Sequence, residues 1–360
     1  MTGTLKETYA RDQRVWDSCA ETYEDRIVCG HPDVTAYECF EEDFLDRVVL
    51  YLARELGKRM HIYDVGCGSG RLHLRYAMKS TDTALLNSRD AETVHGLRRL
   101  NPSYAFEPAL AAQIDSVGGI DFSASMLDLA RAKLYESGLG CFVGDKLRLE
   151  QGSAFDLQPM PTEPLPVVVS VCNSVGVMQG PEGAMALYKS VRRAVETAGG
   201  IGIISGYRQE AVGTFALGNY ESTMDVCGQP CWLSPDTYAS ARYRQVPRRY
   251  KRAYDPDPRV VVDVFDPEGN LVQAGHVLIR DETRVRQTVE TGHIRTHTDY
   301  ESHWYPFSLV DEWINEHWPA GCSYHLAGVD IDALRGEPAQ LSILDPRGLL
   351  KPLLARWKLA

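Results

Sequence analysis

The sequence predicts an α/β protein in which helices cover both faces of a mostly parallel sheet. Short apolar runs typical of buried strands alternate with segments of helical periodicity between residues 59 and 205. A glycine-rich stretch, residues 66–70, separates the first of these strands from the following helix, and that order is the start of a β-α-β unit. Strands that alternate with helices favour parallel pairing, because each helix returns the chain to the same edge of the sheet.

The composition is that of an ordinary folded protein. The 360 residues include 38 Lys and Arg against 49 Asp and Glu, which gives a formal net charge of −11. This charge disfavours nucleic acid as a partner, because a phosphate backbone is repelled. The N-terminus lacks the apolar stretch of a secretory signal, and no apolar run reaches the roughly 18–20 residues that span a bilayer. Nine scattered cysteines form no disulfide framework, so we expect a cytoplasmic protein with no membrane partner.

The core elements are predicted from periodicity and from glycine stops. One or two helices occupy residues 17–56, where acids alternate with apolar residues at helical spacing, and Gly57 ends the second helix. The later core helices are predicted at residues 71–78, 123–136 and 183–196. The core strands are predicted at residues 61–65, 117–121, 147–152, 167–172 and 201–205.

Two segments depart from this alternation. Residues 79–116 are far longer than the usual connection of about 2–6 residues, so we expect them to lie outside the sheet as a lid or an oligomer contact. After Gly206 the pattern favours antiparallel strands, including a hairpin formed by residues 260–265 and 275–279. Further strands are predicted at 283–290 and 293–298, a helix at 307–318, and last strands at 324–329 and 340–344. The predicted domains are a helical cap, a core with the insertion, a β-rich substrate or oligomer region, and a terminal part that completes the core, at residues 1–58, 59–210, 211–300 and 301–360.

The most informative motif is Asp-Val-Gly-Cys-Gly-Ser-Gly at residues 64–70. A plain tight turn and a dinucleotide site are the alternatives for any glycine-rich loop. A dinucleotide site uses G-x-G-x-x-G, with an acid about 20 residues further on that contacts the ribose. Here the glycines follow the spacing G-x-G-x-G, and an acid stands two residues before the first of them. This arrangement favours a ligand that carries no phosphate.

With these motifs the chain resembles the class I S-adenosylmethionine (SAM)-dependent methyltransferases. Residues 64–70 resemble the first motif of that family, and the second, third and fourth follow in order at residues 119–127, 151–157 and 171–174. The resemblance covers roughly residues 15–210 and the last helix and strands. It implies a Rossmann-like, mostly parallel seven-stranded sheet and SAM as the cofactor.

The resemblance also implies roles for individual residues. The acid Asp121 would accept hydrogen bonds from the ribose hydroxyls, because a carboxylate can accept two at once. Ser153 stands where many members have aspartate, so the contact with the adenine amino group passes to Asp156 or to water. Tyr23 would close over the amino-acid part of SAM and Arg26 would meet its carboxylate; the alternatives are core packing for Tyr23 and a solvated face for Arg26. The other implied cofactor contacts are Asp64, Gly66, Cys67, Gly68, Gly70, Phe122, Met126, Ala154, Phe155, Cys172 and Asn173.

A weaker similarity, to glycine N-methyltransferase and its relatives, concerns the acceptor. Asn173-Ser174 and Tyr207-Arg208 follow the fourth and fifth predicted strands, although the second pair is out of register by one residue. We expect Asn173 to orient the nucleophile, Tyr207 to wall the sulfonium, and Arg208 to anchor an acidic group of the substrate. His303 and Tyr305, just before the last helix, are candidates for catalysis and for substrate binding. The expected reaction is in-line methyl transfer to a small amine or amino-acid-like acceptor.

Several alternatives stay open from the sequence. The same fold can use SAM for aminocarboxypropyl transfer or for cyclisation, both of which release methylthioadenosine, or it can bind SAM without consuming it. The basic run 242–252 is a solvated strand, an anchor for a carboxylate or phosphate of the substrate or, as the third alternative, a contact for RNA. Cys227 and Cys231 have no second pair, so no metal is expected. The partners considered are a small-molecule substrate and a second copy of the chain.

Overall fold

The computed structural model describes the first 59 residues only in part. It describes residues 60–207 with one gap, at residues 83–104. The described residues are 12–14, 16, 17, 20, 36–82, 105–207, 220–224, 230–231, 246–254, 264–265, 271–273, 277–283, 298–305, 307–327, 330–331, 334–335 and 339–357. Tyr23, Arg26 and Arg208 lie outside these residues, as do most of the predicted insertion and part of the basic run.

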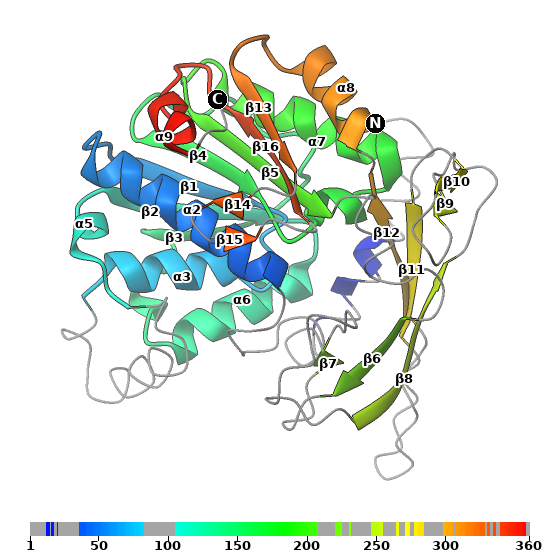
Figure 1. Cartoon of the computed structure of the whole chain (residues 1–360). Helices are drawn as coiled ribbons and strands as arrows, with labels where there is room; N and C mark the ends of the chain where they lie inside the picture. The colour runs from blue at the N-terminus through cyan, green and yellow to red at the C-terminus, as the bar shows by residue number, and fades with distance from the viewer. Residues whose placement is uncertain are drawn as a thin grey trace.

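The centre of the molecule is a seven-stranded sheet with the order β13-β16-β5-β4-β1-β2-β3 (Figure 1). All pairings from β5 through β3 are parallel, and β16 pairs antiparallel with both β5 and β13. One strand therefore runs against six, which confirms the predicted fold class. The strands are β1 (Met60–Val65), β2 (Ile114–Asp121), β3 (Leu147–Gln151), β4 (Leu165–Ser170), β5 (Ile201–Tyr207), β13 (Ser323–Ala327) and β16 (Ala339–Leu344).

Helices cover both faces of this sheet. Adjacent residues of β5 show it: Ile203 packs into one apolar cluster with Phe44 of α2, and Ile204 packs into a second cluster with Tyr188 of α7. Successive side chains of a strand point to opposite faces, so the two clusters are the two layers of core. The helices are α2 (Ala36–Arg54), α3 (Arg71–Ser80), α5 (Pro108–Ala111), α6 (Ala124–Glu136), α7 (Gly180–Val195), α8 (Phe307–His317) and α9 (Lys351–Arg356), with short 3-10 turns η3 (Gly140–Phe142) and η4 (Ser174–Val177).

Several element boundaries differ from the sequence predictions, among them the start of β2 and the end of α3. β2 begins at Ile114, which pairs with Met60, so residues 114–116 belong to the sheet and the prediction that all of 79–116 lies outside it is wrong. The start of β2 could not be recognised in the sequence because Asp115 and Ser116 are polar. In the structure both find partners in β1 or just before it: Arg59 pairs with Asp115, and His61 Nδ1 lies 2.7 Å from Ser116 Oγ. α3 also continues to Ser80.

Strand β4 is also shifted and ends at Ser170, two residues before its predicted end. The chain leaves the extended conformation there because Cys172 and Asn173 both have positive φ angles.

A second, antiparallel sheet of five strands has the order β12-β11-β8-β6-β7. In Figure 1 it lies beyond the end of β5, and β12 contacts η4, the turn that follows β4. The predicted hairpin is wrong in its second strand, because β9 (Val264–Phe265) pairs with β10 (Leu271–Gln273) and β11 pairs with β8 and β12. The remaining strands are β6 (Tyr220–Met224), β7 (Pro230–Cys231), β8 (Val246–Tyr254), β11 (Val277–Thr283), β12 (Thr298–Trp304), β14 (Asp330–Ile331) and β15 (Leu334–Arg335).

Candidate active site

The glycine-rich turn joins β1 to α3 and is fastened to the end of β2. The N–H groups of Gly66 and Cys67 donate to the carbonyl oxygen of Ile120 at 2.8 and 3.1 Å. Gly70, the residue before α3, has φ +75°, and a Cβ there would lie 3.0 Å from the Cβ of Ala130 in α6. Glycine is therefore required at Gly70 both by its left-handed conformation and by the closeness of α6.

Asp121, the last residue of β2, is the acid at the centre of this edge. Its Oδ2 accepts a hydrogen bond of 2.8 Å from the N–H of Gly68, and its Oδ1 accepts one of 2.9 Å from the N–H of Ser123. The residue is buried, and burial raises the pKa of its carboxyl while the backbone donors oppose that rise. The first and second motifs are thus in direct contact through Gly68 and Asp121.

Asp64 lies two residues before the turn and is fully enclosed. Burial raises its pKa to about 7; the Arg71 cation lowers it, and the nearby acids Asp121 and Glu41 raise it further. Cys67 is also buried, and burial raises the pKa of its thiol, so it stays protonated at neutral pH.

The third motif follows β3 and is attached to the second. The N–H of Gly152 donates to the carbonyl oxygen of Asp121 at 2.9 Å. The hydroxyl of Ser153 accepts a hydrogen bond of 3.2 Å from the N–H of Phe155, so its oxygen is engaged in a local turn. Phe155 is buried, Ala154 is half-buried and Asp156 is exposed.

The loop after β4 contains two consecutive left-handed residues that are not glycine. Cys172 has φ +60° and Asn173 has φ +57°. Such residues are uncommon, because a Cβ crowds the backbone in this region. Asn173 is buried, and its Oδ1 lies 3.4 Å from the position that a Cβ would take at Gly206 of β5. The loop after β4 and the end of β5 are therefore neighbours at Asn173 and Gly206.

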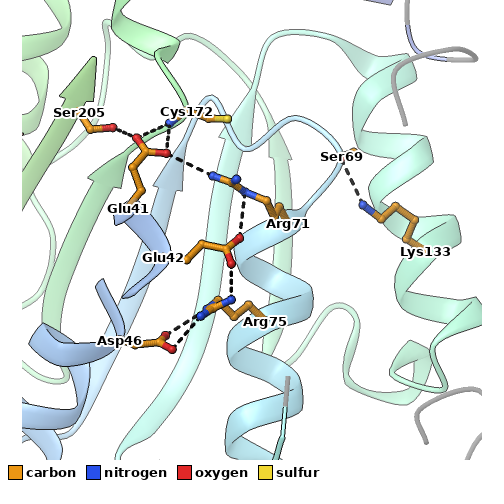
Figure 2. A network of polar contacts seen from close by, with 9 residues as sticks. All are labelled: Glu41, Glu42, Asp46, Ser69, Arg71, Arg75, Lys133, Cys172 and Ser205. Atoms are coloured by element: carbon orange, nitrogen blue, oxygen red, sulfur yellow. Dashed lines mark hydrogen bonds and ion pairs between the residues drawn. The ribbon is translucent and has the colours of Figure 1, made fainter. Parts of the chain in front are cut away.

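One residue of this edge was missed by the sequence analysis. Glu41 of α2 is only 1% exposed, and its carboxylate accepts hydrogen bonds of 2.8 and 3.1 Å from the N–H of Cys172 and another from the hydroxyl of Ser205 (Figure 2). Arg71 Nη2 lies 3.6 Å from it. The signal in the sequence was the position of an acid on the apolar stripe of the helix, at helical spacing from Phe44 and Val48.

The described part of the N-terminal segment also reaches this edge. Gln13 Nε2 donates to the carbonyl oxygen of Phe122 at 2.7 Å. Asp17 Oδ1 accepts from the hydroxyl of Ser123 at 2.6 Å and from the N–H of Ser125 at 3.3 Å. The segment thus lies across the beginning of α6, a contact that no sequence pattern indicates.

The remaining predicted site residues lie at the start of α6, in strands β5 and β12, and in the apolar core. Phe122 is half-buried and Met126 is buried at the start of α6. Tyr207 ends β5 opposite Ala339, and His303 lies in β12 opposite Leu278. Tyr305 is buried in the core, where its ring packs edge-on against that of Trp313 with the two ring centroids 4.9 Å apart. Tyr305 is thus a packing residue of the α7–α8 layer.

Among the described residues, no group of three or more His, Cys, Asp and Glu is arranged to hold a metal ion. No helix in the same part of the chain is both long and apolar enough to cross a membrane.

Comparison with known proteins gives similarity at the level of solved structures. No family model and no curated protein matches the chain. A SAM-dependent methyltransferase from Clostridium acetobutylicum is 12% identical, with a TM-score of 0.48, over 92% of this chain and 98% of that one. The CcbJ methyltransferase from Streptomyces caelestis is 15% identical, with a TM-score of 0.46, over 89% and 96%. The sugar N-methyltransferase KedS8 from Streptoalloteichus is 14% identical, with a TM-score of 0.40, over 84% and 86%.

The fold itself is settled by the strand order, by the single reversed strand β16 and by the glycine-rich turn joined to Asp121. The chain has the Rossmann-like, seven-stranded fold that its resemblance to the class I SAM-dependent methyltransferases predicts.

Proposed function

We propose that this protein is a SAM-dependent methyltransferase that acts on a small molecule with an amine or amino-acid-like acceptor. The observation that carries the proposal is the hydrogen bond from the N–H of Gly68 to Asp121. It holds a buried carboxylate in a fixed place beside the glycine-rich turn. A carboxylate has about four acceptor positions, so Asp121 retains capacity for the two hydroxyls of a ribose.

The charges around the turn support a cationic donor. Glu41, Asp64 and Asp121 are three buried acids, and the cation that influences the pKa of Asp64 is Arg71. Bound SAM would supply an electrophilic methyl group on a positively charged sulfur. Acids of low solvent exposure favour such a cation more strongly than they would in water.

The chain's own contribution to the transfer is alignment and exclusion of water. Methyl transfer to a neutral amine needs no strong base, so positioning supplies most of the catalysis. We assign the orientation of the nucleophile to Asn173, because it follows β4 at the edge where parallel strands end. We assign the wall beside the sulfonium to Tyr207 and an anchor for an acidic substrate group to Arg208.

The remaining assignments follow from the same site. His303 is a candidate to contact the acceptor because β12 contacts the turn that follows β4. We assign selection of the acceptor to the regions that flank this core, residues 1–58 and 211–300. The net charge of −11 supports a small molecule over nucleic acid. The nine scattered cysteines support the cytoplasm as the site of action.

Product analysis tests the proposal. The protein is incubated with SAM and a panel of small amines and amino acids, and the nucleoside products are separated by chromatography. Methyl transfer yields S-adenosylhomocysteine in an amount that matches the methylated acceptor. Methylthioadenosine in its place would show that another carbon of SAM is transferred, and binding of SAM without any product across the panel would support a non-catalytic partner.

A further inference from the structure

We infer that Glu41 is a positioning residue of the transfer site, a role that rests on the proposed function: its carboxylate fixes the left-handed turn at Cys172 and Asn173 and so couples helix α2 to the site. Glu41 belongs to none of the four motifs. It lies more than 100 residues from the turn in the chain, but its carboxylate contacts the turn's backbone directly.

The burial of Glu41 needs an explanation. A buried carboxylate is costly unless it is paired and hydrogen-bonded. The partners of Glu41 come from three elements beside the site: Arg71 begins α3, Cys172 follows β4, and Ser205 lies in β5 (Figure 2). One side chain of α2 therefore ties together the glycine-rich turn's helix, the loop after β4 and the neighbouring strand.

The turn itself requires an external support. Two consecutive left-handed residues with side chains are strained, and such a conformation persists only where the surroundings fix it. Glycine at either position would remove the strain, so side chains in this conformation point to a use for them. The charge-assisted hydrogen bonds from the N–H of Cys172 to both oxygens of Glu41 supply the support.

Docking of α2 onto α3 does not account for Glu41. Two other acids of α2 already provide that contact: Glu42 pairs with Arg75, and Asp46 pairs with Arg75 at 2.8 Å (Figure 2). Asp46 also pairs with Lys79 at 3.0 Å. Glu42 and Asp46 contact residues of α3, whereas Glu41 also contacts the loop after β4 and strand β5. Asp46 is therefore a matched control on the same helix.

The half-buried thiol of Cys172 reports on the turn without any need for a substrate. Its alkylation by iodoacetamide is followed by mass spectrometry in the tryptic peptide 149–189, in which it is the only cysteine. The exposed Cys141 lies in a separate peptide, 134–146, and serves as an internal reference. The variants are Glu41→Ala, Glu41→Gln and the control Asp46→Asn, and each is also titrated with S-adenosylhomocysteine by calorimetry.

The proposal expects Glu41→Ala to raise the alkylation rate of Cys172 relative to Cys141, and to weaken S-adenosylhomocysteine binding, each by about tenfold, because hydrogen bonds to a charge are lost. Glu41→Gln retains an acceptor oxygen and should restore part of both properties. Asp46→Asn should lower the melting temperature and leave both the rate ratio and the affinity within about twofold of the parent.

Each result decides a different point. An unchanged alkylation rate of Cys172 in Glu41→Ala would overturn the claim that Glu41 fixes the turn at Cys172 and Asn173. A changed alkylation rate with unchanged affinity for S-adenosylhomocysteine would overturn the positioning role. If Glu41→Ala does not fold, the same comparisons are made with Glu41→Gln. If the parent itself does not bind S-adenosylhomocysteine, both the proposed function and the positioning role fail. The alkylation rates still test separately whether Glu41 fixes the turn.

Discussion

Asp17 and Ser123 are joined by a hydrogen bond of 2.6 Å from the serine hydroxyl to Asp17 Oδ1, across 106 residues of chain. Ser123 is the N-cap of α6, and its oxygen also accepts from the N–H of Met126. An acid at this position stabilises the helix in two ways, by accepting from a cap residue and by its charge near the positive end of the helix dipole. The N-terminal segment thus supports the helix that begins directly after Asp121.

Replacing Asp17 with Ala should destabilise the protein by about 0.5–2 kcal/mol, because cap and dipole interactions are lost together. Asp17→Asn retains an acceptor and should fall between Ala and the parent. Urea unfolding measures the difference, and hydrogen exchange at the amides of Ser125 and Met126 locates it. Equal stability of Asp17→Ala and the parent would show that the contact contributes nothing.

The buried carboxyl of Asp64 should make stability depend on pH. Its pKa is raised by burial to about 7 in the folded chain, against 3.8 as the ordinary value, so the folded state holds a proton that the unfolded state has lost between these values. The folded state should therefore lose stability, relative to an Asp64→Asn variant, as pH rises from about 4 to about 7, at up to about 1.4 kcal/mol per pH unit.

The measurement for Asp64 is urea unfolding of the parent and Asp64→Asn at half-unit steps from pH 5 to pH 8. The difference in free energy of unfolding should grow in favour of Asn up to about pH 7 and then level off. A difference that stays constant, or that changes in the opposite direction, would contradict a raised pKa at this position.

Gly119 should not tolerate even a methyl group. A Cβ at Gly119 would lie 2.5 Å from His73 Cε1 and 2.8 Å from the Cβ of Cys67. His73 is fully buried, so its ring has no free space to move into, and Gly119→Ala should cost about 1–3 kcal/mol. In a double-mutant cycle with His73→Ala, the two losses should sum to more than the loss in the double variant. Additive losses would show that the ring is not the obstacle.

Arg75 should be among the side chains that stability depends on most. It is 1% exposed and pairs with both Glu42 and Asp46, so Arg75→Met would remove the cation that these two acids share and leave them only the pairs with Arg71 and Lys79. Loss of about 3–5 kcal/mol is expected. The exposed pair of Arg131 and Asp128 is the control, and Arg131→Met should cost less than about 1 kcal/mol. Similar losses in the two variants would contradict the role given to burial.

Local sequence patterns predicted the seven-stranded sheet and the residues at the edge where its parallel strands end. The glycine-rich turn, Asp121 and the strand ends follow from residue order, because parallel strands bring their carboxyl ends to one edge. The start of β2 was missed, since Asp115 and Ser116 look like loop residues until Arg59 and His61 are seen to satisfy them. Such pairings depend on register between distant segments, which a single sequence does not contain.

The contributions of Glu41 and Asp17 could not be read from spacing either. Each acts on backbone or hydroxyl groups more than 100 residues away, so the partner has no signature beside the acid in the sequence. The position of Glu41 on an apolar helix face was the one available sign of burial, and the partner that makes its burial tolerable came only from the structure.

The central claim, that Asp121 and the glycine-rich turn bind the nucleoside of SAM, is tested most directly by calorimetric titration of S-adenosylhomocysteine. The parent is compared with Asp121→Ala, with Asp121→Asn and with Asp128→Ala, an exposed acid of α6 that serves as the control. Thermal unfolding first confirms that each variant is folded. Binding to the parent and to Asp128→Ala, with at least about tenfold weaker binding to Asp121→Ala, is the predicted result, since a hydrogen bond to a charged group is worth about 1.5–3 kcal/mol. A folded Asp121→Ala that binds as tightly as the parent would contradict the claim.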